Sequence, residues 1–216
     1  NSFKDIIDNF GGNLRSFLVG AAMVNPETLA FYRDIGIDSL EGYGMTECAP
    51  FVAVNRFSHY RDDSVGLVLP EMEIRVVNPD SNGIGELAVK GDNVMAGYYK
   101  NQEETDKVLV DGWMMTGDLG YIKEGFIYLT GRAKNLIITD NGKNVYPEEI
   151  EEYLLRSVYI AECMVYESED KKIAAKVFPN FEEVEARFLA MGFNRAFPPG
   201  TPIEKTVPFI KQDLGE

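Results

Sequence analysis

One stretch, residues 112–147, constrains the fold and the function of this chain more than any other. Within it, Asp118 lies between two glycines, Gly117 and Gly120. Because glycine allows a sharp change of backbone direction, we expect a tight turn that leaves the short Asp118 carboxylate exposed as an acceptor for a pair of hydroxyl groups. A ribose diol fits this description.

The residues after this turn predict a strand followed by a basic connector. The apolar alternation of residues 126–130 is typical of a strand, and Gly131 would end it. Arg132 and Lys134 would then leave on the same side of an extended connector, where they could meet an anion. Taken alone, an Asp in a turn is more often structural than functional, and an Arg-x-Lys pair is more often a solvated surface.

A second informative segment lies near the start of the chain. Residues 16–19 predict a strand, residues 26–35 a helix and residues 37–40 the next strand, which is an α/β signature. That strand leads into residues 41–47, where Tyr43 stands between two glycines. By itself, this pattern more often marks a packed turn than a binding site.

The side chains of this segment nevertheless suit a nucleotide. An adenine could stack on Tyr43, and phosphates could lie near the hydroxyl of Thr46. Glu47 offers a hard carboxylate oxygen of the kind that Mg²⁺ prefers. We therefore expect nucleotide and metal contacts at this second segment.

The rest of the chain predicts two further structural regions. Short β-runs between residues 64 and 130 indicate a small β-barrel or sheet subdomain. After a boundary near Lys134, the patterns predict a small α+β domain: a strand at 135–139, a hairpin turn at 140–142, a helix at 147–155, strands at 161–167 and 173–178, and a helix with the apolar stripe Phe181, Val184, Phe188 and Met191 that ends at Gly192.

Composition excludes several classes of function. The net charge of −14, from 35 acidic and 21 basic residues, argues against a nucleic-acid or anionic-membrane surface. Cys48 and Cys163 are too few for a disulfide framework, and no apolar run approaches the roughly 20 residues of a membrane span. These features predict a reduced, cytoplasmic protein without a transmembrane segment, and they leave peripheral membrane contact open. The first residues lack a methionine, so we expect a piece of a longer chain.

Several motifs together resemble the adenylate-forming superfamily, which includes acyl-CoA synthetases, firefly-type luciferases and the adenylation domains of peptide synthetases. The resemblance rests on matches in order and spacing: Tyr43-Gly44-Met45-Thr46-Glu47, Trp113, Thr116-Gly117-Asp118, Gly131-Arg132-x-Lys134 and the run from Gly142 to Glu151. The wording Gly-Lys-Asn-Val-Tyr-Pro-Glu at residues 142–148 looks most like the long-chain fatty acyl-CoA synthetase branch.

The resemblance implies a role for each matching residue. AMP from bound ATP would be held by residues that share a place in the family's nucleotide site: Gly20, Ala21, Ala22, Tyr43, Gly44, Met45, Thr46, Asp118 and Arg132. Glu47 would bind Mg²⁺, and Lys134 would be the hinge about which a C-terminal lid swings between adenylation and thioester formation. Gly142 would line the approach of coenzyme A (CoA), the co-substrate. Without the family, simple close packing explains Gly20 to Ala22 equally well.

The resemblance also implies a three-part organisation. Residues 1–63 would be the late part of a large α/β nucleotide-binding subdomain, residues 64–132 a β-rich subdomain and residues 133–216 the α+β lid domain. The family's phosphate-binding loop, rich in Gly, Ser and Thr and ending in Lys, is absent from the sequence, as is the upstream acyl-binding half. Lys211 is the first candidate for the second catalytic lysine of the family, and Lys205 is the second candidate. The residues around both lysines depart from the family pattern.

Three functions are consistent with these motifs. The first is the C-terminal portion of an ATP-dependent long-chain fatty acid–CoA ligase, which forms an acyl-adenylate and then a thioester with CoA. The second is an adenylation enzyme that loads another acceptor, such as a carrier protein. The third is a non-catalytic AMP-binding piece, which is what we expect of this chain by itself because the phosphate loop is missing.

Overall fold

The structure, a computed structural model, describes residues 3–21 and 24–190. The chain divides into two compact units, Asn1–Lys134 and Asn135–Glu216. The expected finer division of the first unit near residue 63 stays a prediction. Ala22, Lys205, Lys211 and the helix-ending Gly192 lie outside the described residues.

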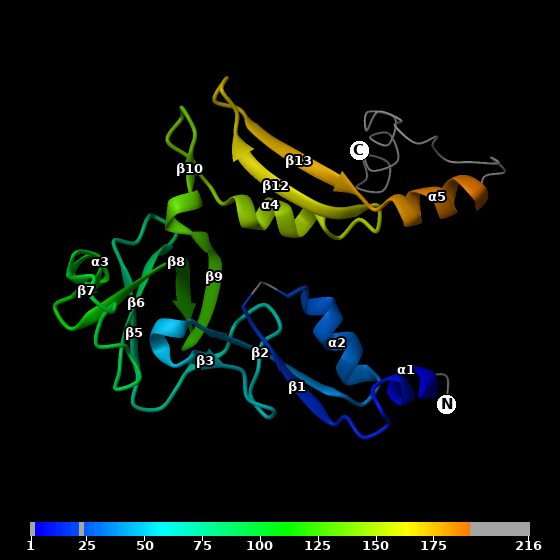
Figure 1. Ribbon diagram of the computed structural model, residues 1–216, viewed down its shortest axis with the longest axis horizontal. Coiled ribbons are helices and arrows are strands. Elements are labelled where there is room, and N and C mark those ends of the chain that lie inside the picture. The colour runs from blue at the N-terminus through cyan, green and yellow to red at the C-terminus, as the bar shows by residue number, and fades with distance from the viewer. Residues whose placement is uncertain (1–2, 22–23, 191–216) are drawn as a thin grey trace. The chain divides into compact units, whose positions relative to one another are not determined.

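The first unit is a mixed α/β structure, as predicted (Figure 1). Helix α2, for example, begins where Asn25 accepts a hydrogen bond from the Glu27 amide at 2.8 Å and Pro26 occupies the first turn. The elements in chain order are α1 (Lys4–Asn9), β1 (Ser16–Val19), α2 (Pro26–Asp34), β2 (Asp38–Gly44), η1 (Thr46–Cys48), β3 (Phe51–Val54), β4 (Leu67–Val68), β5 (Glu73–Val77), β6 (Gly85–Lys90), α3 (Gln102–Val108), β7 (Leu109–Val110), β8 (Trp113–Lys123) and β9 (Phe126–Arg132).

These strands form one nine-stranded sheet in the order β1-β2-β3-β4-β9-β8-β6-β5, with β7 paired to β8. Strands β1 and β2 are parallel, and the other pairs are antiparallel. Within the described part of the chain β1 and β5 end the sheet without pairing to each other. The α/β and sheet predictions are confirmed, whereas the barrel-like form is not: the β-rich residues continue the sheet begun by β1 and β2.

The expected turn around Tyr43 is instead part of a strand. Strand β2 continues to Gly44, and Tyr43 pairs with Ala53 of β3. A Cβ atom at Gly44 would lie 1.9 Å from the Pro50 carbonyl oxygen, so glycine is required there by the close approach of another backbone segment.

The expected turn at Asp118 is a bulge within β8. Gly117 has a φ of +73°, and the pairing of β8 with β6 shifts register between Glu86 and Ala88. The Thr116 hydroxyl donates to the Leu87 carbonyl at 2.8 Å, which ties the bulge to β6. Gly131 likewise does not end β9, which continues to Arg132, and the connector after it is a short 3-10 helix, η2 (Ala133–Asn135), rather than an extended segment.

The core of the first unit lies at the centre of the sheet. Its fully or nearly buried members come from β2, β3, β6, β8, β9 and the segments that join them: Tyr43, Cys48, Val52, Ala53, Val65, Leu87, Val89, Met114 and Ile127. Tyr43 is itself a member of this core, and Met114 of the core lies on the same strand as Asp118, so the core anchors the strands that carry both motifs.

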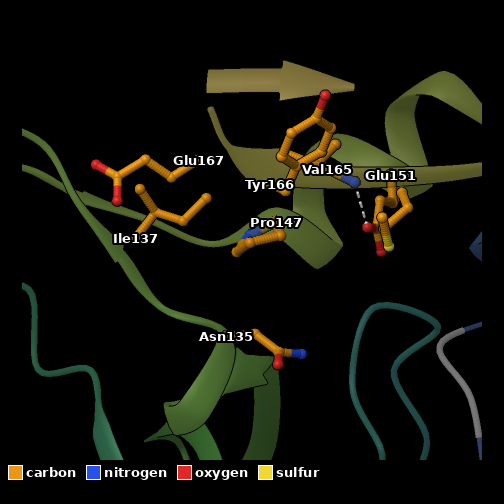
Figure 2. Close-up of a pocket in the computed structure, with 8 residues that line it drawn as sticks. Asn135, Ile137, Pro147, Glu151, Val165, Tyr166 and Glu167 are labelled. Carbon is orange, nitrogen blue, oxygen red and sulfur yellow. Dashed lines mark hydrogen bonds between the residues drawn. The ribbon is translucent and has the colours of Figure 1, made fainter. Parts of the chain in front are cut away.

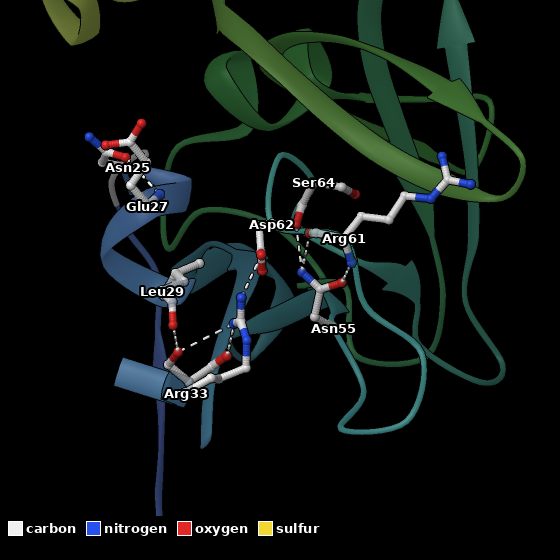
Figure 3. Close-up of polar contacts among 9 residues, drawn as sticks. Asn25, Glu27, Leu29, Arg33, Asn55, Arg61, Asp62 and Ser64 are labelled. Carbon is white, nitrogen blue, oxygen red and sulfur yellow. Dashed lines mark hydrogen bonds and ion pairs between the residues drawn. The ribbon is translucent and has the colours of Figure 1, made fainter. Parts of the chain in front are cut away.

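Polar contacts connect α2 to the loop of residues 55–64 (Figure 3). Arg33 forms an ion pair with Asp62 at 2.5 Å and donates to the Ser39 carbonyl at 3.0 Å. Asn55, only 3% exposed, donates to the Arg61 and Ser64 carbonyls and accepts from the Arg61 amide. The loop therefore folds around one asparagine side chain.

The second unit contains the helix and hairpin predicted for it. Its elements are β10 (Ile137–Ile138), β11 (Asn144–Val145), α4 (Pro147–Leu154), β12 (Ile160–Glu167), β13 (Ile173–Pro179) and α5 (Phe181–Ala190). Strands β10 and β11 form one antiparallel pair, β12 and β13 another, and α4 packs on β12 (Figure 1). Over residues 135–190 the α+β prediction is confirmed.

In the described ranges, 3–21 and 24–190, none of the helices has the length and the apolar character that crossing a membrane requires.

Replacement of Asn55 by alanine should lower the free energy of unfolding by about 2–3 kcal/mol, because buried backbone groups of the 55–64 loop would lose their partners. Urea denaturation of the purified chain measures the change. Asn82→Ala, in the exposed loop between β5 and β6, is the control and should stay within about 0.5 kcal/mol of the parent chain. Equal effects of the two changes would contradict the role assigned to Asn55.

Candidate functional site

The two predicted nucleotide motifs meet at the carboxylate of Asp118. Its Oδ2 atom accepts a hydrogen bond from the Tyr43 hydroxyl at 2.6 Å, and its Oδ1 atom forms an ion pair with Nε of Arg132 at 2.8 Å. Asp118 is only 7% exposed, so the expectation of an open carboxylate is wrong: two partners cover it. Two residues, Tyr43 of β2 and Arg132 of β9, thus converge on one acid of β8.

Tyr43 acts in this arrangement as a hydrogen-bond donor. Burial, followed by the nearby Asp118 carboxylate, raises the pKa of Tyr43 far above its usual value, so the hydroxyl keeps its proton at neutral pH. The residue is 6% exposed and belongs to the core. The aromatic surface that it offers for stacking with an adenine is therefore small.

Arg132 remains half exposed although it pairs with Asp118. Its side chain keeps 49% of its surface accessible, and the contact with the acid uses Nε. The planar guanidinium has further N–H groups that suit an anion. The predicted role of Arg132 in positioning a nucleotide is compatible with this geometry.

A cavity of about 360 Å³ brings together the other predicted binding residues of the first unit. It lies where the parallel strands β1 and β2 end, a place where α/β proteins commonly bind ligands. Gly20, Ala21, Gly44, Met45 and Thr46 line it. A Cβ atom at Gly20 would lie 2.7 Å from the Gly42 carbonyl oxygen, so close packing also explains this glycine.

Ala21 has an unusual backbone conformation at the edge of this cavity. Its φ of +72° lies in the left-handed region, which non-glycine residues rarely adopt. Such strain occurs preferentially at functional sites. The conformation supports a functional interpretation of the small-residue segment.

The predicted metal ligand Glu47 has a partner that the sequence did not reveal. The hydroxyl of Tyr98 donates to its Oε1 atom at 2.9 Å, and this contact raises the pKa of Tyr98. Tyr98 lies 51 residues after Glu47, and no pattern in the sequence connected the two residues. No group of three or more His, Cys, Asp or Glu residues that could hold a metal occurs among the described residues.

Glu47 nevertheless suits Mg²⁺ in one respect. Magnesium in nucleotide sites is usually held by one or two protein carboxylates together with phosphate oxygens and waters. A single carboxylate beside the predicted phosphate position is compatible with that chemistry. The role of Glu47 stays a prediction.

The predicted residues of the connector and the lid have simple local environments. Lys134 is exposed, lies within η2 and is the last residue of the first unit. Gly142 occupies the turn between β10 and β11 with a φ of +73°, and its amide donates to the Thr139 carbonyl at 2.7 Å. The hairpin turn is confirmed, while the roles of Lys134 and Gly142 stay predictions.

A second cavity, of about 320 Å³, lies in the second unit beside α4 (Figure 2). Glu151 anchors its wall by accepting a hydrogen bond from the Val165 amide at 2.7 Å. Pro147, Tyr166 and Glu167 also line it. None of the predicted binding residues does, so we assign it no ligand.

Comparisons with known proteins agree with the motifs. Residues 3–99 match the sequence model of a family described as AMP-binding enzyme. Over 156 residues, the chain is 37% identical to the long-chain-fatty-acid–CoA ligase FadD15 of Mycobacterium bovis, a match that covers 72% of this chain and 25% of that protein. Over 173 residues, it is 36% identical to the chloroplastic long-chain-fatty-acid–[acyl-carrier-protein] ligase AEE15 of Arabidopsis thaliana, which covers 72% of this chain and 24% of that protein.

A solved structure shows the same relationship. The chain resembles O-succinylbenzoate coenzyme A synthetase (MenE) from Bacillus subtilis in complex with AMP, with a TM-score of 0.70, 26% identity, and coverage of 91% of this chain and 45% of that one. The chain spans about a quarter of the length of the two curated relatives and less than half of this structural neighbour. With the match over residues 3–99 to the AMP-binding enzyme family, these similarities confirm the resemblance drawn from the motifs: the chain is similar in sequence and in fold to adenylate-forming enzymes.

Proposed function

We propose that this chain is the C-terminal portion of an ATP-dependent long-chain fatty acid–CoA ligase. The observation that carries the proposal is the convergence of Tyr43 and Arg132 on Asp118, since it joins three family motifs into one acceptor site. The similarity to a long-chain-fatty-acid–CoA ligase supports the choice of substrate class. In this proposal, a fatty acid or a related carboxylate is activated as acyl-AMP and then transferred to CoA.

Each residue of the first unit then has a defined task. Asp118 accepts hydrogen bonds from the ribose hydroxyls, and the exposed part of Arg132 faces negative charge on the nucleotide. Gly20, Ala21, Gly44 and Met45, which line the cavity, would lie against the adenine. The same role is assigned to Ala22 from the family resemblance alone, because Ala22 lies outside the described residues.

Thr46 and Glu47 lie directly after these residues, where phosphates and Mg²⁺ would be held. When bound, Mg²⁺ supplies positive charge that stabilises the phosphoryl oxygens during attack by the carboxylate.

The second unit supplies the lid in this proposal. Lys134 lies at the boundary between the units, so a change of its backbone angles would reorient one unit against the other. Gly142 would line the path of the CoA thiol, and Lys211 would be the second catalytic lysine. The phosphate-binding loop and the acyl pocket belong to upstream residues of the longer enzyme, which we place in the cytoplasm, with peripheral membrane contact left open.

Transfer of the acyl group to a carrier protein is the alternative. It is favoured by one observation, the 36% identity to a relative named for an acyl-carrier-protein acceptor. A direct comparison of CoA and acyl carrier protein as acceptors for the longer enzyme separates the two. By itself, the 216-residue chain should bind AMP weakly and should not catalyse fatty-acid-dependent pyrophosphate exchange.

Replacement of Asp118 by asparagine should weaken AMP binding by about tenfold to a hundredfold, because hydrogen bonds from the ribose to a charged acceptor contribute about 1.5–3 kcal/mol. Isothermal titration calorimetry of the 216-residue chain measures the affinity. Asp62→Asn is the matched control, since Asp62 also pairs with an arginine but has no predicted ligand. If both changes leave AMP binding unaltered, the ribose site is wrongly assigned.

Replacement of Lys134 by proline in the longer enzyme should slow thioester formation at least tenfold and leave AMP affinity within about twofold. Proline fixes φ and restricts the preceding residue, so the connector loses the freedom that a swinging lid requires. Lys134→Ala removes the charge but keeps backbone freedom, and it separates the two contributions. Single-turnover kinetics of each half-reaction provide the measurement, and equal losses in both half-reactions and in binding would contradict the hinge.

A further inference from the structure

A phenylalanine ring could fill the same space in the core as the Tyr43 ring, so packing alone does not explain why the residue at position 43 carries a hydroxyl. The ring lies in the core of the first unit, among apolar side chains. Burying a phenol hydroxyl costs free energy unless it forms a hydrogen bond, and here it donates to Asp118 at 2.6 Å. The Tyr43 hydroxyl is therefore explained by its hydrogen bond to the Asp118 carboxylate.

Asp118 is held by one donor on each oxygen. Tyr43 occupies one acceptor position of Oδ2 and Arg132 one of Oδ1. A carboxylate offers about four acceptor positions, so roughly one remains on each oxygen. Two adjacent hydroxyls of a ribose have the matching pair of donors.

We propose that Tyr43 is a positioning residue for ribose recognition: its hydroxyl fixes the Asp118 carboxylate in the orientation that accepts both ribose hydroxyls. This inference rests on the proposed nucleotide function and gives Tyr43 a task other than adenine stacking. A carboxylate fixed on both oxygens has less freedom to lose when the diol arrives, so it distinguishes a complete diol from one that lacks a hydroxyl. Without the Tyr43 hydroxyl, Asp118 can rotate and accept a single hydroxyl equally well.

The test compares AMP with 2′-deoxy-AMP by calorimetry on the 216-residue chain and its Tyr43→Phe variant. The variant should bind AMP about tenfold more weakly but 2′-deoxy-AMP less than threefold more weakly, so that the preference for the complete diol shrinks. Tyr128→Phe is the matched control: Tyr128 is equally buried at 6%, and its hydroxyl bonds to Arg61 at 2.9 Å. Its two affinities should match those of the parent chain.

A double-variant cycle supplies the second measurement. In the Asp118→Asn background, Tyr43→Phe should weaken AMP binding less than twofold, because the group that it positions is already changed. This comparison remains informative if Tyr43→Phe lowers the melting temperature, since both backgrounds carry the same change in packing.

Three outcomes would overturn the inference. Equal weakening of AMP and 2′-deoxy-AMP by Tyr43→Phe would assign Tyr43 to stacking or packing alone. Additive effects of the two variants would show that Tyr43 does not act through Asp118. Absence of AMP binding by the parent chain would overturn the proposed function, and the inference with it.

Discussion

Tyr43, Asp118 and Arg132 form a triad in which the Asp118 carboxylate is held between the Tyr43 hydroxyl and the Arg132 guanidinium. The arrangement of the candidate site in the first unit depends on these two contacts. An exposed ion pair alone would contribute little, typically below about 1 kcal/mol. Here the acid is buried, and loss of a partner would leave a desolvated charge with one donor fewer. The triad therefore favours one relative arrangement of strands β2, β8 and β9.

Strand register makes this triad possible. Strands β8 and β9 form a hairpin with a two-residue turn. The turn sets the register in which Lys123 pairs with Phe126 and Gly120 pairs with Leu129. Beyond that point one extra residue enters β9, and the pairing shifts so that Asp118 lies opposite Arg132. Without this shift, Asp118 would lie opposite Gly131, which has no side chain that could pair with the carboxylate.

Local signals predicted the elements that local chemistry determines. Helix α2 begins at Asn25 and Pro26 because capping and proline geometry act within a few residues. Gly44 and Gly120 were interpreted as parts of turns and Gly131 as the end of a strand, which was wrong because each of them pairs with a residue of a neighbouring strand. At Gly120, for example, a Cβ atom would lie 2.2 Å from the Tyr128 carbonyl oxygen. A single sequence shows the glycine but not the backbone segment that approaches it, and likewise it gave no sign that Tyr98 contacts Glu47.

The sequence left packing and binding open at Gly20, and the structure shows what packing requires there. A Cβ atom there would collide with the Gly42 carbonyl, so packing requires the glycine. Yet Gly20, Gly42 and Gly44 also line the cavity at the ends of β1 and β2. Packing and binding are therefore compatible at Gly20: the close approach of the backbone requires a glycine, and a glycine leaves its backbone uncovered on the cavity side, where the predicted flat ring could lie.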